Sequence, residues 1–280
     1  MTETPRTVLI TGASAGIGAA CVLRFATAGW RVAAAARRTE RLETLAAEAR
    51  AAAPGAEILP LPCDVADSAS VAAAFQALHA RFGALDALVN NAGYGHYGTL
   101  EQARLEDFQA SMETNYLGAV RCTQAALPLL KAAAAARGGR WGANVVCVSS
   151  IVGRRAFPGA GAYCASKFAL EGFAEALRVE LRSLRIGVSV VNPGLTRTEF
   201  FESAGGQRPP GFLQPEGGMP PEVVARTILR CARSPRRNVY LTLPGKLAVL
   251  AQWLSPRLLD AVLARTWQGK APARGKKESS

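Results

Sequence analysis

Short apolar runs alternate with longer segments of helical periodicity along most of the chain. Each apolar run has the length of a buried strand, whereas the longer segments repeat their apolar positions at i, i+3 and i+4. The pattern predicts strands over residues 7–10, 31–36, 57–61, 87–89, 144–149 and 187–191. The predicted helices lie between these strands, over residues 17–28, 39–53, 68–81, 105–136 and 163–184.

This alternation of strands and helices indicates an α/β fold. A strand followed by a helix and then by another strand returns across the sheet by a right-handed crossover, so the strands run parallel and helices cover both faces. We predict a single doubly wound, Rossmann-type parallel sheet within residues 1–245. In such folds the ligand binds at the carboxyl ends of the strands.

The C-terminal part of the chain continues with shorter elements. Pro220-Pro221 introduces a predicted helix over residues 222–233, and a short strand is predicted over residues 239–243. Apolar residues then recur at helical spacing on both sides of Ser255-Pro256, a pair that fits the start of a second helix. We predict an amphipathic extension over residues 246–270 and a disordered basic tail over residues 271–280.

The positive charge of the protein is concentrated in this C-terminal part. The chain carries 33 Lys and Arg residues against 21 Asp and Glu residues, a formal net charge of +12. Residues 226–280 contribute 12 of the basic and only 2 of the acidic side chains. The segment 246–280 either contacts anionic lipid or, as we favour, packs against residues 199–221 or a partner subunit. Nucleic acid is not an expected partner, because the sequence contains no recognition module.

The cysteine and histidine content argues against two classes of site. The 6 cysteines are scattered without a Cys-x-x-Cys pair and only 2 histidines occur, so we expect neither a metal site nor a disulfide scaffold. Free thiols indicate a reducing compartment, and we predict a cytoplasmic protein. The sequence contains no apolar run long enough for a spanning helix, and its N-terminus lacks the apolar stretch of a signal peptide.

A glycine-rich turn joins the first predicted strand to the first predicted helix. Glycines permit a tight turn and a close approach of the backbone to a pyrophosphate, and the next helix offers unpaired N–H groups and the positive end of its dipole. The spacing Gly-x-x-x-Gly-x-Gly, placed between strand and helix, predicts dinucleotide binding. The expected contacts are Thr11, Gly12, Ser14, Gly16, Ile17 and Gly18.

The end of the second predicted strand indicates which dinucleotide binds. A carboxylate there would accept hydrogen bonds from the ribose 2′-hydroxyl, whereas an arginine pairs with a 2′-phosphate. The sequence is Ala36-Arg37-Arg38, so we predict NADP(H) rather than NAD(H), with Arg37 as the main phosphate contact and Arg38 beside it. The alternative is two solvated arginines at a helix entrance. Ala15 weighs slightly against NADP(H), because a basic residue in the turn would have supported it.

The residues after the third predicted strand, Asp64-Val65, are expected to contact the adenine. A carboxylate at this position meets the adenine amino group. The alternative role of Asp64 is to cap the next helix, although Asp67 and Ser68 lie nearer to the helix start.

Further motifs follow the later strands in order. They are Asn90-Asn91-Ala92-Gly93, Asn115-Tyr116-Leu117-Gly118, Ser149-Ser150 and Tyr163-Cys164-Ala165-Ser166-Lys167. Together with the glycine turn, this ordered set closely resembles the short-chain dehydrogenase/reductase family over residues 7–200. Any one of these motifs arises easily by chance, whereas the ordered set does not.

The chemistry of this family explains why Tyr163 and Lys167 lie four residues apart. On a helix this spacing places both side chains on one face. A phenol with a pKa of about 10 is a poor acid–base catalyst at neutral pH, and a neighbouring ammonium group favours the phenolate. The resemblance implies that Tyr163 donates the proton to the carbonyl oxygen, that Lys167 also binds the nicotinamide ribose and that Ser150 holds the substrate oxygen. It further implies that Asn115 anchors a water linking Lys167 to solvent.

Other contacts are implied by the resemblance alone. A loop after the sixth strand would close one side of the nicotinamide pocket, with Thr198 as the expected carboxamide contact and Thr196 as the competing one. The resemblance also implies a substrate lid over residues 199–221. Phe200, at the start of this lid, implies an apolar substrate, although a packed surface loop explains it equally well. The cofactor contacts implied in this way are Asn91, Ala92, Gly93, Pro193, Gly194, Thr196 and Thr198.

We therefore predict an NADP(H)-dependent oxidoreductase that interconverts a ketone or aldehyde and an alcohol on an apolar small molecule. The resemblance implies assembly into a homodimer or homotetramer. Two alternatives stay open. One is an NADP-binding sensor or scaffold without turnover, and the other is a membrane-surface reductase whose segment 246–280 contacts lipid.

Overall fold

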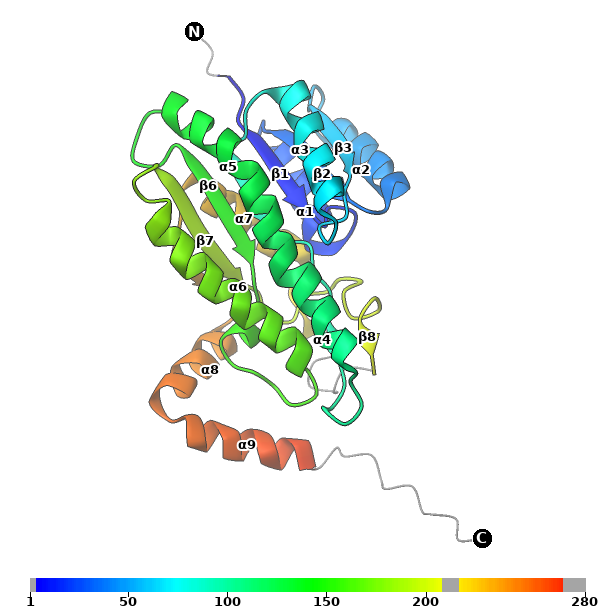
Figure 1. Cartoon of the computed structure of the whole chain (residues 1–280), viewed down its shortest axis with the longest axis vertical. Coiled ribbons are helices and arrows are strands. Elements are labelled where there is room, and N and C mark those ends of the chain that lie inside the picture. Colours follow the sequence, from blue (N-terminus) through cyan, green and yellow to red (C-terminus); the bar gives the residue numbers. More distant parts are fainter. Residues whose placement is uncertain (1–3, 208–216, 269–280) are drawn as a thin grey trace.

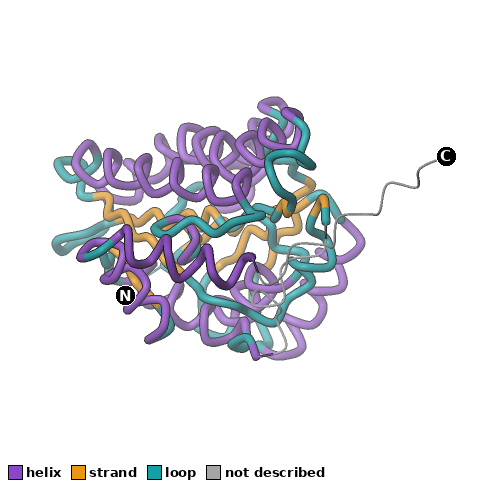
Figure 2. Tube along the Cα trace, turned by 90° about the horizontal axis from the view of Figure 1, so that it is seen from below, coloured by secondary structure: helices purple, strands orange, loops and turns teal. Residues whose placement is uncertain are grey.

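One central sheet, covered by helices on both faces, forms the body of the protein (Figures 1 and 2). The computed structural model describes residues 4–207 and 217–268. This architecture confirms the doubly wound α/β sheet that the alternation of strands and helices predicts. The predicted tail at 271–280 and the middle of the predicted lid, residues 208–216, lie outside the described residues.

The sheet is seven-stranded and parallel, with the order β3-β2-β1-β4-β6-β7-β9. This order reverses direction between β1 and β4, so the chain leaves these two strands toward opposite sides and a crevice opens at their carboxyl ends. The register brings the strand ends level, with Thr11 beside Ala35 and Asn90 beside Cys147. The strands are β1 (Thr7–Thr11), β2 (Arg31–Ala36), β3 (Ile58–Pro62), β4 (Ala87–Asn90), β6 (Ala143–Val148), β7 (Ile186–Asn192) and β9 (Asn238–Tyr240).

Two helical layers bury apolar clusters against the sheet. Helices α1, α2 and α7 cover one face, with Phe25 and Ile228 fully buried, and α3, α5 and α6 cover the other, with Leu130 and Leu170 fully buried. Each such side chain contributes about 1.5–3 kcal/mol to folding. The bounds are α1 (Gly16–Ala26), α2 (Thr39–Ala52), α3 (Ser68–Phe82), α5 (Gly118–Ala136), α6 (Gly161–Glu180) and α7 (Pro221–Arg233).

The helix predicted over residues 105–136 is confirmed, with one local change of winding. The chain forms α4 (Leu105–Met112), a π-helical turn (Glu113–Leu117) and α5 in direct succession. Asn115 lies in the π-helical turn, and its side chain hydrogen-bonds to the backbone of Tyr94 and to Ser166. Such single turns insert one extra residue into a helix and are frequent at functional sites. Here the turn carries Asn115, whose side chain reaches a loop outside its own helix.

The strand predicted over residues 239–243 is shorter than expected. It is β9, and Leu243 already begins α8 (Leu243–Leu254). The Thr242 hydroxyl accepts a hydrogen bond from the backbone N–H of Gly245 and caps this helix. The cap starts a helix at the point where the apolar pattern alone continues a strand.

The C-terminal helices α8 and α9 (Pro256–Gln268) extend from the end of the body at which the strands finish (Figure 1). Arg155 joins them to the body, because its guanidinium donates to Gln252 at 2.8 Å and to Asp260 at 2.7 Å. Much of their apolar surface is exposed, including Trp253 and Leu254. Within residues 4–207 and 217–268, no helix is long and apolar enough to cross a membrane.

A second, two-stranded sheet ties the loop after β7 to the loop after β4. Its strands are β5 (His96–Tyr97) and β8 (Gly205–Gly206), which pair in parallel. His96 is buried, and its Nε2 atom lies 3.5 Å from the carboxylate of Asp107 in α4. Strands of two residues leave no periodic signal, so the sequence pattern does not predict them.

Candidate active site

A cleft of about 930 Å³ lies at the carboxyl ends of the strands. It occupies the crevice expected where the strand order reverses. Thr11, Gly18 and Asn115 do not line the cleft themselves, but each of them contacts a residue that does. The other predicted site residues all line the cleft: Gly12, Ser14, Gly16, Ile17, Arg37, Arg38, Asp64, Val65, Asn91, Ala92, Gly93, Ser150, Tyr163, Lys167, Pro193, Gly194, Thr196, Thr198 and Phe200.

The glycine turn is too tight for side chains at its glycine positions. Gly12 has a φ of 64° and Gly16 a φ of 53°, and a Cβ atom added to Gly18 would lie 2.2 Å from the carbonyl oxygen of Gly12. Asn91 fastens the turn to the end of β4, because its side-chain amide donates to the carbonyl of Thr11 at 2.9 Å. The N-terminus of α1 therefore lies open at the cleft, and this cradle fits a pyrophosphate.

Two arginines lie at the carboxyl end of β2. Arg37 and Arg38 both line the cleft, and Arg38 Nε donates to the Ser14 hydroxyl of the glycine turn at 3.1 Å. Arg38 is thus the arginine that the structure joins to the glycine turn, and the larger role predicted for Arg37 stays a prediction. Asp67 caps α3 by accepting a hydrogen bond from the Ala69 N–H at 2.9 Å, which leaves Asp64 at the cleft and not at the helix cap.

Ser150, Tyr163 and Lys167 come together at the other end of the cleft. Tyr163 and Lys167 lie on successive turns of α6, and Ser150 follows β6. Ser150 lies near enough to Tyr163 to act on the pKa of its hydroxyl. The Lys167 ammonium lies 5.8 Å from the centre of the Tyr163 ring and donates to the carbonyl of Val148 at 2.9 Å. The four-residue spacing in the sequence therefore places the phenol and the ammonium side by side.

Burial shifts the protonation of both groups. It raises the pKa of the Tyr163 hydroxyl, and the neighbouring Ser150 side chain opposes this rise. Burial lowers the pKa of Lys167 from 10.5 to about 8, while the negative charge of Glu171 favours the charged form. Glu171 is itself buried and is held by Arg154, whose guanidinium lies 2.7 Å from its carboxylate. In the free protein Tyr163 is therefore a protonated donor with a cationic neighbour.

Asn115 holds the loop after β4 against α6. Its Nδ2 atom donates to the carbonyl of Tyr94 at 3.0 Å and to the Ser166 hydroxyl at 2.9 Å, and its Oδ1 atom accepts from the Tyr94 N–H at 2.9 Å. A Cβ atom added to Gly93 would lie 2.8 Å from Asn115 Oδ1 and 3.5 Å from Lys167 Nζ. Asn115 thus shapes the wall beside Lys167, and its part in a water relay stays a prediction.

Aromatic side chains surround Tyr163 at this end of the cleft. The ring centre of Phe200 lies 5.4 Å from that of Tyr163, and that of Phe201 lies 5.6 Å from that of Phe200. Tyr97 stacks on Phe201 with ring centres 6.3 Å apart, and Phe157 also lines the cleft. The space next to the Tyr163 hydroxyl is therefore mainly apolar.

Two parts of the cleft were not predicted from the sequence. The first turn of α8 contributes Pro244 and Gly245 to its wall, and the capping threonine before this turn is a signal for the helix start but not for its place in the cleft. The second part is Glu199, which forms ion pairs with Arg38 and with Arg41 of α2. No local pattern connects residues so far apart in the chain.

The doubly wound sheet and the combination of glycine turn, serine, tyrosine and lysine in one cleft define a dinucleotide-dependent oxidoreductase. The chain matches the family model described as short chain dehydrogenase over residues 6–208. It therefore belongs to the short-chain dehydrogenase/reductase family. As a member of this family it interconverts carbonyl and alcohol groups with a nicotinamide dinucleotide.

Relatives and solved structures agree with this assignment. Dehydrogenase/reductase SDR family member 7B of Bos taurus is 35% identical over 267 residues, which cover 92% of this chain and 80% of the relative. Retinol dehydrogenase 8 of Homo sapiens is 39% identical over 203 residues, which cover 71% of this chain and 62% of the relative.

Two solved structures show the same fold with different cofactors. An alcohol dehydrogenase from the archaeon Thermococcus sibiricus, complexed with 5-hydroxy-NADP, has a TM-score of 0.73 and 29% identity and covers 85% of this chain and 95% of its own. A short chain dehydrogenase/reductase from Burkholderia phymatum, in complex with NAD, has a TM-score of 0.80 and covers 91% of this chain and 95% of its own. At 24% identity the second structure is evidence for the fold alone.

Proposed function

We propose that this enzyme uses NADP(H) to interconvert a ketone or aldehyde and the corresponding alcohol on an apolar small molecule. The carrying observation is that Ser150, Tyr163 and Lys167 lie in the same cleft as Arg38 and the glycine turn. When bound, the cofactor supplies or accepts the hydride. In the direction of reduction, Ser150 holds the carbonyl oxygen and Tyr163 donates its hydroxyl proton to it. Lys167 stabilises the phenolate that is left.

A carbonyl panel tests this mechanism. Turnover is followed by the loss of NADPH absorbance, with apolar ketones and aldehydes compared against small polar ones. Tyr163→Phe removes the proton donor and keeps the ring that packs against Phe200, so we expect turnover to fall by about 10²–10⁴-fold with NADPH binding retained. A sensor or scaffold would bind NADPH without converting any member of the panel. Turnover that survives Tyr163→Phe would contradict the proposed mechanism.

The proposed preference for NADP(H) rests on Arg37 and Arg38 at the end of β2, where an NAD(H) enzyme would carry a carboxylate. Arg37→Asp and Arg38→Asp test the two arginines separately. Loss of one charge-assisted contact should weaken NADPH binding by about 1–3 kcal/mol and NADH binding much less. Equal losses for the two cofactors would refute the preference.

The α8–α9 segment, residues 243–268, is proposed to contact an anionic membrane surface. Trp253 and Leu254 are 87% and 74% exposed. Such exposure fits an interfacial segment, and the experiment below separates this contact from the packing against the lid or a partner that the sequence favours. The choice of lipid follows from charge, because residues 243–268 carry 3 basic and 1 acidic side chains and residues 269–280 of the sequence add 4 basic and 1 acidic.

Vesicle co-sedimentation tests this contact. We expect the protein to sediment with vesicles that contain phosphatidylserine and not with pure phosphatidylcholine, and to be released by salt. The double variant Trp253→Ser/Leu254→Ser should stay in the supernatant. Val179→Ser, which removes a 77% exposed apolar side chain from α6, is the matched control and should sediment like wild type. Equal sedimentation of all variants, or a double variant that only changes the oligomeric state, would contradict the membrane contact.

We also propose that the protein is cytoplasmic and assembles into a homodimer or homotetramer. All six cysteines are free and buried, which fits a reducing compartment. The oligomeric state is tested by light scattering coupled to gel filtration at several protein concentrations. A monomer at every concentration would contradict the proposed assembly.

A further inference from the structure

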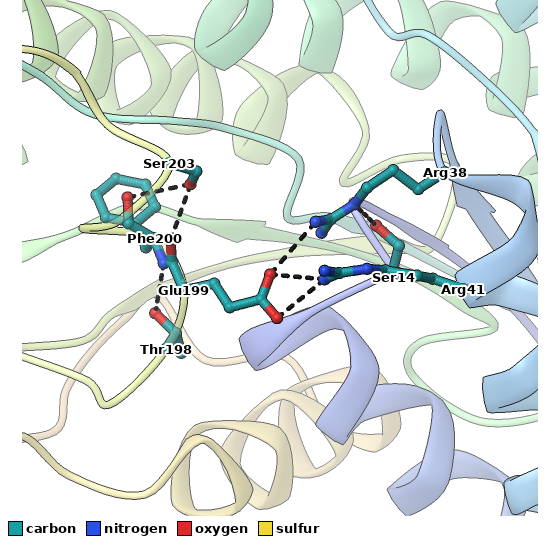
Figure 3. Close-up of polar contacts among 7 residues, drawn as sticks. All are labelled: Ser14, Arg38, Arg41, Thr198, Glu199, Phe200 and Ser203. Atoms are coloured by element: carbon teal, nitrogen blue, oxygen red, sulfur yellow. Dashed lines mark hydrogen bonds and ion pairs between the residues drawn. The ribbon is translucent and has the colours of Figure 1, made fainter.

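A carboxylate from the loop after β7 lies between two arginines at the adenosine end of the cleft (Figure 3). The carboxylate of Glu199 receives hydrogen bonds from Arg41 at 2.6 and 2.9 Å and from Arg38 at 3.3 Å. Arg38 is in turn joined to Ser14 of the glycine turn. An acidic side chain thus occupies the surroundings in which a bound 2′-phosphate would be recognised.

The surroundings of this carboxylate are those of an anion site. Arg38 is the N-cap of α2 and Arg41 lies in its first turn, where the positive end of the helix dipole already favours an anion and opposes a cation. The presence of an arginine at position 41 is therefore not explained by a contribution to helix stability. A carboxylate and a phosphate present similar pairs of oxygen acceptors to a guanidinium group, so one replaces the other with little rearrangement of the arginines.

The loop presents Glu199 to the arginines in a defined conformation. The Ser203 hydroxyl donates to the backbone carbonyls of Glu199 and Phe200 at 2.9 and 3.2 Å (Figure 3). The hydrogen bond from Arg41 lowers the pKa of Glu199, which keeps the carboxylate charged. Both ion pairs are about half exposed, with 47% to 49% of each side chain accessible, so a ligand in solution can displace them.

We infer that Glu199 competes with the 2′-phosphate of NADP(H) for Arg38 and Arg41, and that Arg41 is a further arginine of the phosphate site. Glu199 is then a specificity-determining residue that lowers the affinity for NADP(H) and leaves NAD(H) almost unaffected. NAD(H) has no 2′-phosphate, so its binding does not depend on contacts with the two arginines. The inference rests on the proposed preference for NADP(H).

Binding constants for NADPH and NADH, measured by calorimetry on the whole chain, test this competition. Glu199→Gln removes the charge and keeps the size of the side chain. Exposed ion pairs are each worth up to a few-fold in affinity, so we expect NADPH to bind about three- to tenfold more tightly and NADH to change by less than about twofold. Glu202→Gln removes a negative charge from an exposed position of the same loop. As the matched control, it should leave both affinities as in wild type.

Arg41 is tested in the Glu199→Gln background, in which the carboxylate that pairs with Arg41 in wild type is absent. Arg41→Gln should there weaken NADPH binding about three- to tenfold and spare NADH. The competition is overturned if Glu199→Gln leaves NADPH affinity unchanged, weakens it, or shifts both cofactors equally. If wild type binds both cofactors equally and Arg38→Asp does not discriminate between them, the proposed NADP(H) preference itself fails. If that preference holds and Glu199→Gln has no effect, the competition alone fails.

Discussion

The depressed pKa of Lys167 makes the stability of this enzyme depend on pH in a predictable direction. Lys167 is 4% exposed, and burial lowers its pKa from 10.5 to about 8. Between these two pH values the unfolded chain binds a proton that the folded chain releases. Folding is therefore penalised at low pH, and the contribution of this lysine to stability improves as the pH rises through the window.

The size of this effect follows from the two pKa values. The penalty is about 3 kcal/mol at pH 7, where the lysine is charged in both states, and about 1 kcal/mol at pH 10, where the folded state has released the proton. Lys167→Met removes the titration. We therefore expect the free energy of unfolding of wild type, relative to Lys167→Met, to rise by about 2 kcal/mol between pH 7 and pH 10. Lys167→Met also loses the hydrogen bond to Val148. This loss changes the difference in free energy of unfolding by a similar amount at every pH, so it does not alter the expected rise with pH.

Urea unfolding followed by circular dichroism at several pH values between pH 7 and pH 10 measures the difference. Because the other ionisable groups are shared by both proteins, their titration cancels in the comparison. Lys131→Met, which removes an exposed lysine from α5, controls for the loss of one positive charge. A difference between wild type and Lys167→Met that is constant from pH 7 to pH 10 would refute the claim that Lys167 is desolvated in the folded protein.

Other predictions concern the core, the glycine turn and the charge behind the active-site lysine. Asp86→Ala removes a carboxylate that is 3% exposed and ion-paired, and should cost about 3–5 kcal/mol of unfolding free energy in urea titrations. Glu57→Ala, which breaks an exposed pair, should cost less than about 1 kcal/mol, and equal losses would contradict the burial argument. Gly18→Ala should abolish NADPH binding measured by calorimetry, because its Cβ atom would lie 2.2 Å from a backbone oxygen. Gly172→Ala, whose Cβ atom would meet nothing within 4 Å, should bind normally. Glu171→Gln removes a negative charge that raises the pKa of Lys167, so the alkaline limit of the pH–activity profile should move to lower pH. A limit that does not move would show that this carboxylate does not act on Lys167.

The parts of the fold that the sequence pattern predicts are those that depend on local periodicity. The strands were located because burial on both faces makes each a short continuous apolar run, and the helices because burial of one face imposes a regular repeat on their residues. The helix over residues 105–136 is predicted in the same way, but the π-helical turn within it is not. Asn115 in this turn hydrogen-bonds to Tyr94 and Ser166, which lie in other elements, and such contacts leave no local repeat in the sequence.

The same distinction between local and long-range features applies to the candidate site. The glycine turn and the Tyr163–Lys167 spacing are contained in single stretches of chain, and backbone geometry converts each stretch directly into an arrangement of atoms. The first turn of α8 was missed, because its place in the cleft wall depends on where the preceding strand delivers it.

The α/β architecture, the glycine-rich turn and the shared helix face of Tyr163 and Lys167 can be predicted from the sequence alone. Each of these is encoded by residues that are close together in the chain or repeated at a regular period. Which carboxylate meets the arginines after β2 depends on the tertiary structure. Glu199 and Arg41 are 158 residues apart in the chain. The path of the loop after β7 across the cleft brings them together, and that path is set by packing and by long-range hydrogen bonds that no local pattern records.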